Sequence, residues 1–386
     1  VLVSGRLHGA LVGTAAGIFA LTTPLFFELA HYFKEDPALV FGLSLSLVAM
    51  QIYGERPSRA RVAMLGAACG VAISAKYPGL MILPFAVYAV LSAKRGKDLL
   101  ILAAFAAGAF CLINWPMITS PEIWKSRVDL EVSRLQAEGV PNRRQVPHGI
   151  YFSVFGKHSS PFILGLLGLY AWSVWRRRFH LSAVEWTLLL MPSIYLLLIS
   201  FIPTKSDRYA LPASVLLACV AAAGLAPLAG WRHGKILAVT ACIGAVAWQV
   251  PKLLAEDAAF SSRRHEEVTD FMRSQLPPAS AVLVDNYNSL GAPDYPEPKI
   301  KERQFQPGET LESLKRAGFS HVLVTAERYP VFAPESRRAS GLRKEDEDKM
   351  RDLYNDIFNR CRLVSRWEAG EKKMLQPEFR LYELPQ

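Results

Sequence analysis

Residues 37–97 read PALVFGLSLSLVAMQIYGERPSRARVAMLGAACGVAISAKYPGLMILPFAVYAVLSAKRGK, and the order of apolar and charged stretches in this segment decides the fold. Its three apolar runs, 37–53, 62–75 and 78–92, consist mainly of Ala, Leu, Val, Ile, Phe and Gly. The first gap between them carries three Arg, the second gap carries only Lys76-Tyr77, and three more cations follow the last run. This alternation of basic and cation-poor gaps is typical of a chain that crosses a membrane repeatedly.

The same pattern extends over the first 250 residues. The nine apolar runs in series are 10–29, 37–53, 62–75, 78–92, 99–118, 161–175, 184–203, 210–229 and 236–250. Several are shorter than the roughly 20 residues that a bilayer favours, so buried helices of a large soluble protein are the alternative. Residues 1–255 contain too little polar sequence to cover nine such helices, and broken spans are common around cavities. The sequence therefore predicts a membrane all-α helical bundle of about nine spans.

Charge predicts how these spans are oriented. If the run 10–29 starts on the cytoplasmic side, the loops 54–61, 93–98, 176–180 and 230–235 fall inside and hold eleven Lys and Arg. The loops 31–36, 76–77 and 204–209 fall outside and hold four. One assignment thus satisfies the positive-inside rule in every short loop. The net charge of +10 is mostly this topology signal, and no basic stripe predicts nucleic-acid binding.

The chain changes character after about residue 252, where apolar runs give way to dense mixed charge. We predict a polytopic domain over 1–255, with an outer loop at 119–160, and an extracytoplasmic α/β domain over 256–386. In the second domain, the expected helices 266–275, 310–317 and 344–359 alternate with the expected strands 281–285, 321–325, 362–367 and 378–384. This alternation predicts a mostly parallel sheet with an antiparallel edge.

Two further segments bear on the organisation of the chain. Residues 119–138 carry one apolar stripe at helical spacing, which predicts a helix that lies on the outer interface or packs on the second domain. Val1 stands in the middle of the pattern, so we expect at least one further span upstream. Four of the five cysteines lie in apolar runs, and no metal-binding or disulfide spacing occurs. No cofactor is therefore implied with certainty, although a divalent metal is compatible with the outer loops.

Ionisable and aromatic residues gather in the loops that are predicted to lie outside: His31, Lys34, Glu35, Asp36, Lys76, Tyr77, Lys205, Arg208 and Tyr209. A single Lys at this depth could merely extend to the lipid headgroups. The whole set on the face where few cations are expected favours a functional site. Lys and Arg could hold a phosphate, and a nearby carboxylate could deprotonate an acceptor hydroxyl.

Three stretches resemble one family. His31-Tyr-Phe-Lys-Glu-Asp36-Pro-Ala-Leu-Val-Phe41, Gly70–Leu80 and Thr204-Lys-Ser-Asp-Arg-Tyr-Ala-Leu-Pro212 are similar to motifs of the polytopic GT-C glycosyltransferases, which include protein O-mannosyltransferases and aminoarabinose transferases. The strands of the tail resemble the extracytoplasmic domain of bacterial members. The resemblance implies an enzyme of the plasma (inner) membrane that moves a sugar from a polyprenyl-phosphate carrier to an extracytoplasmic glycan, lipid or protein acceptor.

The resemblance also implies roles for single residues. Lys205, Arg208 and Lys76 would contact the lipid phosphate, while Tyr209 and His31 would line the sugar pocket. Asp36 would match an acidic residue of the family, whose main catalytic acid lies in a loop that would precede Val1. Two other readings remain open: a transporter or flippase for a lipid-linked saccharide, and a non-catalytic envelope assembly protein.

Overall fold

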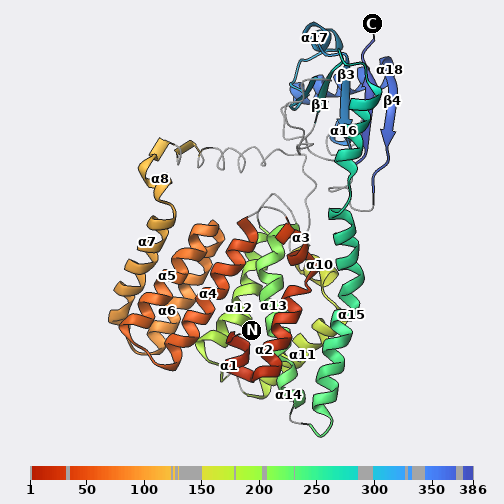
Figure 1. Ribbon diagram of the computed structural model, residues 1–386. Helices are drawn as coiled ribbons and strands as arrows, with labels where there is room; N and C mark the ends of the chain where they lie inside the picture. Colours follow the sequence, from red (N-terminus) through yellow and green to blue (C-terminus); the bar gives the residue numbers. More distant parts are fainter. Residues whose placement is uncertain are drawn as a thin grey trace. The chain divides into compact units, whose positions relative to one another are not determined.

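The computed structural model describes two compact units, which are treated separately (Figure 1). The division falls between Leu254 and Ala255. The described residues are 2–31, 35–122, 125–126, 129, 150–177, 180–201, 207–229, 231–285, 299–326, 329–332, 344–370 and 377–385. Most of the predicted outer loop 119–160, including most of its predicted helix, therefore lies outside the described residues.

The first unit is helical. Its elements are α1 (Leu2–His8), α2 (Ala10–Leu21), α3 (Pro24–His31), α4 (Glu35–Glu55), α5 (Arg59–Ala75), η1 (Tyr77–Met81), α6 (Ile82–Ser92), η2 (Gly96–Asp98), α7 (Leu99–Ile113), α8 (Trp115–Thr119), α10 (Ile150–His158), α11 (Pro161–Arg176), α12 (Ala183–Ile199), η3 (Asp207–Ala210), α13 (Leu211–Ala223), α14 (Leu225–Ala229) and α15 (Gly234–Phe260), whose last residues belong to the second unit.

Every predicted apolar run consists mainly of helix within the described residues, but the expected count of about nine spans is not confirmed. In the part of the chain that the structure describes, four helices are long and apolar enough to cross a membrane: Glu35–Glu55, Gly96–Ile113, Arg208–Leu228 and Gly234–Gln275. The pair α2 and α3, bent by 56°, would make five. The other runs give shorter helices because the chain breaks early, as at Lys76, where α5 ends after 17 residues.

Hydrogen bonds fix the turn between α4 and α5. The Ser58 side chain accepts a hydrogen bond from the backbone N–H of Arg61, which caps the start of α5. The Arg61 guanidinium in turn donates to the carbonyl oxygen of Ile52 at 2.8 Å, near the end of α4. Further along α5, Gly66 and Gly70 lie so close to α7 that an added Cβ would sit about 2.5 Å from α7 carbonyl oxygens. Small residues thus let α5 and α7 run side by side.

The second unit is an α/β domain. Its elements are α16 (Arg264–Gln275), β1 (Ala281–Asp285), β2 (Lys299–Glu302), α17 (Leu311–Arg316), β3 (His321–Thr325), η4 (Tyr329–Val331), α18 (Lys344–Arg360), β4 (Arg362–Trp367) and β5 (Phe379–Glu383). The sheet order is β2-β1-β3-β5-β4; β1, β2 and β3 are parallel, and β5 is antiparallel to both of its neighbours. The predicted parallel sheet with an antiparallel edge is confirmed, and β2 is a strand that the sequence did not predict.

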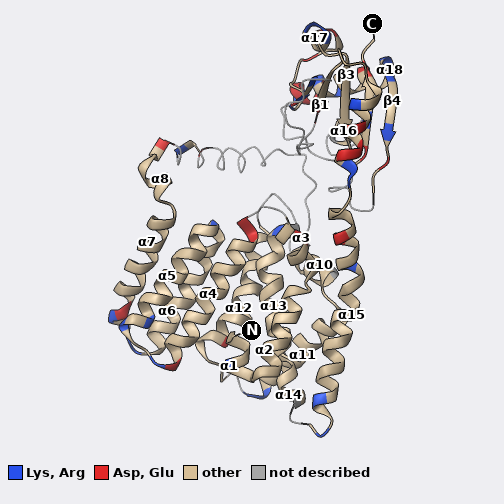
Figure 2. Cartoon of the chain, viewed as in Figure 1, with Lys and Arg blue, Asp and Glu red and all other residues tan. Residues whose placement is uncertain are grey.

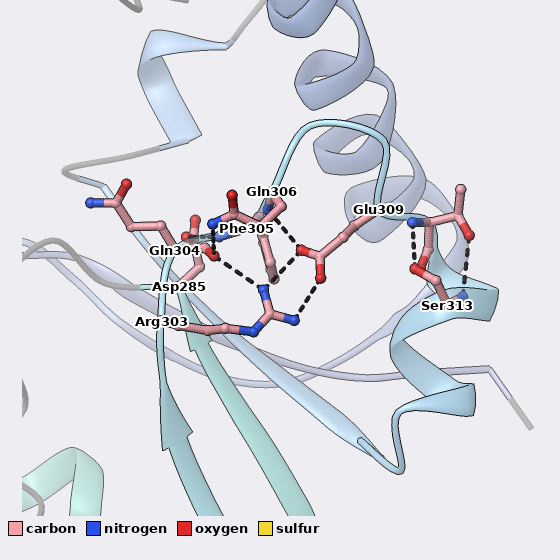
Figure 3. Close-up of polar contacts among 8 residues, drawn as sticks. Asp285, Arg303, Gln304, Phe305, Gln306, Glu309 and Ser313 are labelled. Atoms are coloured by element: carbon pink, nitrogen blue, oxygen red, sulfur yellow. Dashed lines mark hydrogen bonds and ion pairs between the residues drawn. The ribbon is translucent and has the colours of Figure 1, made fainter.

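A polar cluster fixes the chain where it leaves β2 (Figure 3). The Arg303 guanidinium donates to both carboxylate oxygens of Glu309, at 3.0 and 2.6 Å. Glu309 also accepts from the backbone N–H of Gln306, and the buried Asp285 at the end of β1 accepts from the backbone N–H of Phe305 at 2.9 Å. These bonds hold the loop between β2 and α17 against the end of β1.

Candidate functional site

Three breaks in the helices of the first unit bring the candidate site together. α4 begins at Glu35, so its first turn carries two carboxylates. α5 ends at Ala75, and Lys76 follows in an extended conformation before the short helix η1, in which Pro78 prevents a continuous helix. The η3 turn, which carries Arg208 and Tyr209, precedes α13. Charged side chains at these breaks meet without interrupting a helix interior.

The centre of the site is an ion pair between α4 and the α5–η1 break. The Lys76 ammonium lies 2.7 Å from Asp36 Oδ1 and 3.2 Å from Glu35 Oε1. The Lys76 and Asp36 side chains are only 12% and 2% exposed, whereas Glu35 is 49% exposed. Two carboxylates at the start of a helix are also favoured by the helix dipole. Asp36 Oδ2 is buried and has no hydrogen-bond partner among the described residues.

An aromatic ring joins the second cation to this pair. The Lys76 ammonium lies 5.4 Å from the centroid of the Tyr209 ring, and the Arg208 guanidinium lies 5.3 Å from the same centroid. Both distances are within the range of cation–π attraction. Arg208 also interacts electrostatically with Asp36 and Glu35. Two cations and two carboxylates from segments 170 residues apart therefore share one site.

Two tyrosines that the sequence did not single out border the cluster. Tyr195 of α12 is buried and interacts electrostatically with Asp36, Tyr209, Tyr77 and Tyr151. Tyr151 of α10 is also buried. The signal in the sequence was weak, because Tyr195 lies among apolar residues in the middle of the run 184–203 and Tyr151 lies in the predicted outer loop.

The structure gathers some of the predicted site residues and leaves others aside. Asp36, Lys76, Arg208 and Tyr209 lie together, and Tyr77 stands beside Lys76 with 65% of its surface exposed. The contacts described for His31 are with Phe27 of its own helix, through a 2.8 Å hydrogen bond to the carbonyl oxygen and a ring contact. Lys34 and Lys205 lie outside the described residues.

The balance of charge limits what this site can bind. Within the described part of the site, the charges of Lys76 and Arg208 equal those of Glu35 and Asp36. A phosphate that enters must therefore compete with carboxylates for the Lys76 ammonium. The described residues contain no group of three His, Cys, Asp or Glu side chains placed to hold a metal ion.

Two comparisons with known proteins found matches, one to a family and one to a solved structure. Residues 5–122 match the family model for dolichyl-phosphate-mannose-protein mannosyltransferases. The chain also shares its fold with ArnT from Cupriavidus metallidurans, at 14% identity over 98% of this chain and 80% of that one. The TM-score is 0.53 for the apo crystal structure and 0.51 for the structure bound to undecaprenyl phosphate. A comparison with curated proteins gave no match.

The family match covers the part of the chain that supplies Asp36 and Lys76, and the shared fold covers nearly all of it. Residues 5–122 are thus similar to the mannosyltransferase family, and the chain as a whole shares the fold of ArnT.

Proposed function

We propose that this enzyme moves a sugar from a polyprenyl-phosphate carrier to an extracytoplasmic acceptor, with the lipid phosphate as the leaving group. The observation that carries the proposal is the convergence of Lys76, Arg208 and Tyr209 around Asp36 at helix breaks of the bundle. Its support from comparison is the related structure of ArnT, which is bound to undecaprenyl phosphate. A lipid phosphate carries the anion that two clustered cations can hold while its charge develops.

The geometry suggests a division of roles. Arg208 is less enclosed by carboxylates than Lys76, so it would contact the phosphate first, joined by Lys205. Lys76 would exchange the half-exposed Glu35 for a phosphate oxygen and keep its bond to Asp36. Asp36 is almost completely buried and bonded to Lys76, so we propose that it acts on the reaction by holding that ammonium. Tyr209, Tyr77 and His31 would line the sugar pocket.

The wider assignment of the chain belongs to the same proposal. Residues 1–255 would form the transferase domain in the plasma (inner) membrane, with the loop 119–160 on the outer side. Residues 256–386 would form an extracytoplasmic domain near the acceptor, which is a glycan, lipid or protein. The eleven cations of the inner loops against four in the outer loops support this orientation.

The test is sugar transfer in membranes by Arg208 variants. Arg208→Ala should lower transfer about a hundredfold or more, the usual cost of removing one donor that stabilises developing charge. Arg208→Lys should recover part of the loss, because it restores the charge without the planar guanidinium. Arg176→Ala is the matched control, since this exposed arginine stacks on Trp172 of its own helix. Unchanged transfer by Arg208→Ala would remove this residue from the site.

A further inference from the structure

The loops α4–α5 and α6–α7 lie together at one end of the helical unit. Arg95, in the second loop, donates from its guanidinium to the carbonyl oxygen of Pro57 in the first loop, at 3.0 Å. The helices that follow, α5 and α7, begin at these loops and pack closely along their lengths. Figure 2 shows Lys and Arg at the ends of the helices that these loops connect. Two loops, joined by a hydrogen bond between residues 38 positions apart in sequence, therefore form one surface.

Four cations on this surface form no ion pair with the residues that the structure describes. We call Arg56, Arg59, Lys94 and Lys97 the basic platform; all four are exposed, and none has an ion pair within the described ranges. The two acidic residues of the loops are already engaged. Glu55 pairs with Arg6 at 2.8 Å, and Asp98 pairs with Arg95 at 2.6 Å.

A buried donor lies beside the basic platform. Tyr53, in the last turns of α4, is completely buried, and its hydroxyl has no hydrogen-bond partner among the described residues. It interacts electrostatically with Asp98 and Arg95 of the α6–α7 loop. A hydroxyl that is completely buried does not reach a ligand on the exposed surface, so the exposed cations carry the recognition.

The apolar surroundings decide between a lipid and a water-soluble anion. Leu91 and Leu100 flank the second loop and are 51% and 80% exposed. Leu100 stands on a helix that is long and apolar enough to cross a membrane, and Leu91 stands on a shorter apolar helix. A ligand with a phosphate at one end and acyl chains at the other fits both features, whereas a soluble anion uses only the cations.

We propose that the basic platform binds the phosphodiester headgroup of an anionic phospholipid in the leaflet that borders this end of the bundle. Near a membrane surface, each Lys or Arg contributes about a fivefold preference for anionic lipid. Four such cations on two joined loops can hold one headgroup for longer than a scattered set. The inference is independent of the sugar-transfer proposal, because it uses none of the residues of that site.

The experiment measures lipid binding to the purified full chain in neutral detergent by native mass spectrometry and thermal unfolding. The probes are phosphatidylglycerol, phosphatidylcholine of the same chain length, and inorganic phosphate. The wild type should retain phosphatidylglycerol over phosphatidylcholine and unfold at a higher temperature with it. The double variant Arg59→Gln/Lys97→Gln should bind phosphatidylglycerol about tenfold or more weakly and bind phosphatidylcholine as before.

The matched control is Arg232→Gln/Lys235→Gln, which removes two exposed cations from the α14–α15 turn. The proposal predicts that this control keeps the preference of the wild type. An equal loss in the control would show that only total charge matters and would overturn the site. Equal stabilisation by inorganic phosphate would overturn the lipid assignment, and a double variant with unchanged binding would overturn both.

Discussion

Asp36 is a carboxylate that the helical unit tolerates only because Lys76 accompanies it. The two side chains are almost completely enclosed, and the distance between their charged atoms is 2.7 Å. A buried ion pair of this kind contributes little against a well-packed apolar pair, but loss of one partner leaves an uncompensated charge. The pair therefore fixes where the Lys76 ammonium stands, which is what a phosphate site needs.

The coupling of this pair can be measured with Asp36→Asn, Lys76→Met and the double variant. Each single variant should lower the free energy of unfolding in detergent by about 3 kcal/mol, and the double variant should lose clearly less than the sum. Glu35→Gln is the control; its half-exposed side chain predicts a change below about 1 kcal/mol. Additive losses would show that the two residues do not stabilise each other.

The sequence predicted which residues belong to this site, but it did not predict how their side chains contact one another. Asp36, Lys76 and Arg208 were recognised because charged residues are unusual at the ends of apolar runs. Their pairing depends on how α4, α5 and α13 pack, which a single sequence does not contain. Tyr195 was missed because its neighbours in the sequence are apolar, and nothing local shows that it interacts electrostatically with Asp36.

Among the elements, α5 and α7 pack closely because small residues lie between them. Gly70→Val should destabilise the bundle by about 2 kcal/mol, because the new Cβ would lie 2.5 Å from the Ala106 carbonyl oxygen and 2.7 Å from Ala109 Cβ. Gly108→Val on α7 is the matched control, since nothing lies within 4 Å of its added Cβ. Thermal unfolding in detergent compares the two, and equal midpoints would argue against the close α5–α7 packing.

The loop between β2 and α17 predicts a pH dependence. Burial alone would raise the pKa of Glu309, but hydrogen bonds from Arg303 and the backbone N–H of Gln306 outweigh it and hold that pKa below its ordinary value. A lowered folded-state pKa contributes stability above the ordinary value of about 4.3 and loses it as the pH falls through the folded value. Glu309→Gln should therefore cost about 1 kcal/mol at neutral pH and nothing in acid.

Hydrogen exchange of the β1 and β3 amides in the full chain measures this cost at each pH. Glu312→Gln is the control, because Glu312 is mostly exposed and lies 4.0 Å from Lys315. If the two variants behave alike, or if the loss of stability in Glu309→Gln persists in acid, the ion pair between Glu309 and Arg303 does not cause the pH dependence.

At the scale of the whole molecule, the sequence pattern predicted the helices and the strands β1, β3, β4 and β5 more reliably than the count of spans. The apolar runs form helices, as expected for long segments whose apolar side chains are removed from water. The parallel part of the sheet followed from alternating helices and strands, whereas β2 was missed because Lys299–Glu302 reads as a charged, exposed segment. The count of about nine spans stays a prediction, because short runs end at breaks such as Lys76 and composition alone does not show whether such a run crosses the membrane.

Orientation is a prediction for the entire chain. A reporter fused after Gln386 should be active only on the extracytoplasmic side, and one inserted between Lys94 and Lys97 should report from the cytoplasm. The two fusions control each other, since they must give opposite signals. A cytoplasmic signal from the first and an outer signal from the second would reverse the assignment of both faces.

The most direct measurement compares the affinity of the purified full chain for a polyprenyl phosphate and for the polyprenyl alcohol of the same length. The wild type should prefer the phosphate by about tenfold or more, because a hydrogen bond to a charged group contributes about 1.5–3 kcal/mol. Arg208→Ala and Lys76→Met should lose this preference while their affinity for the alcohol stays the same. An undiminished preference for the phosphate in both variants would contradict the account.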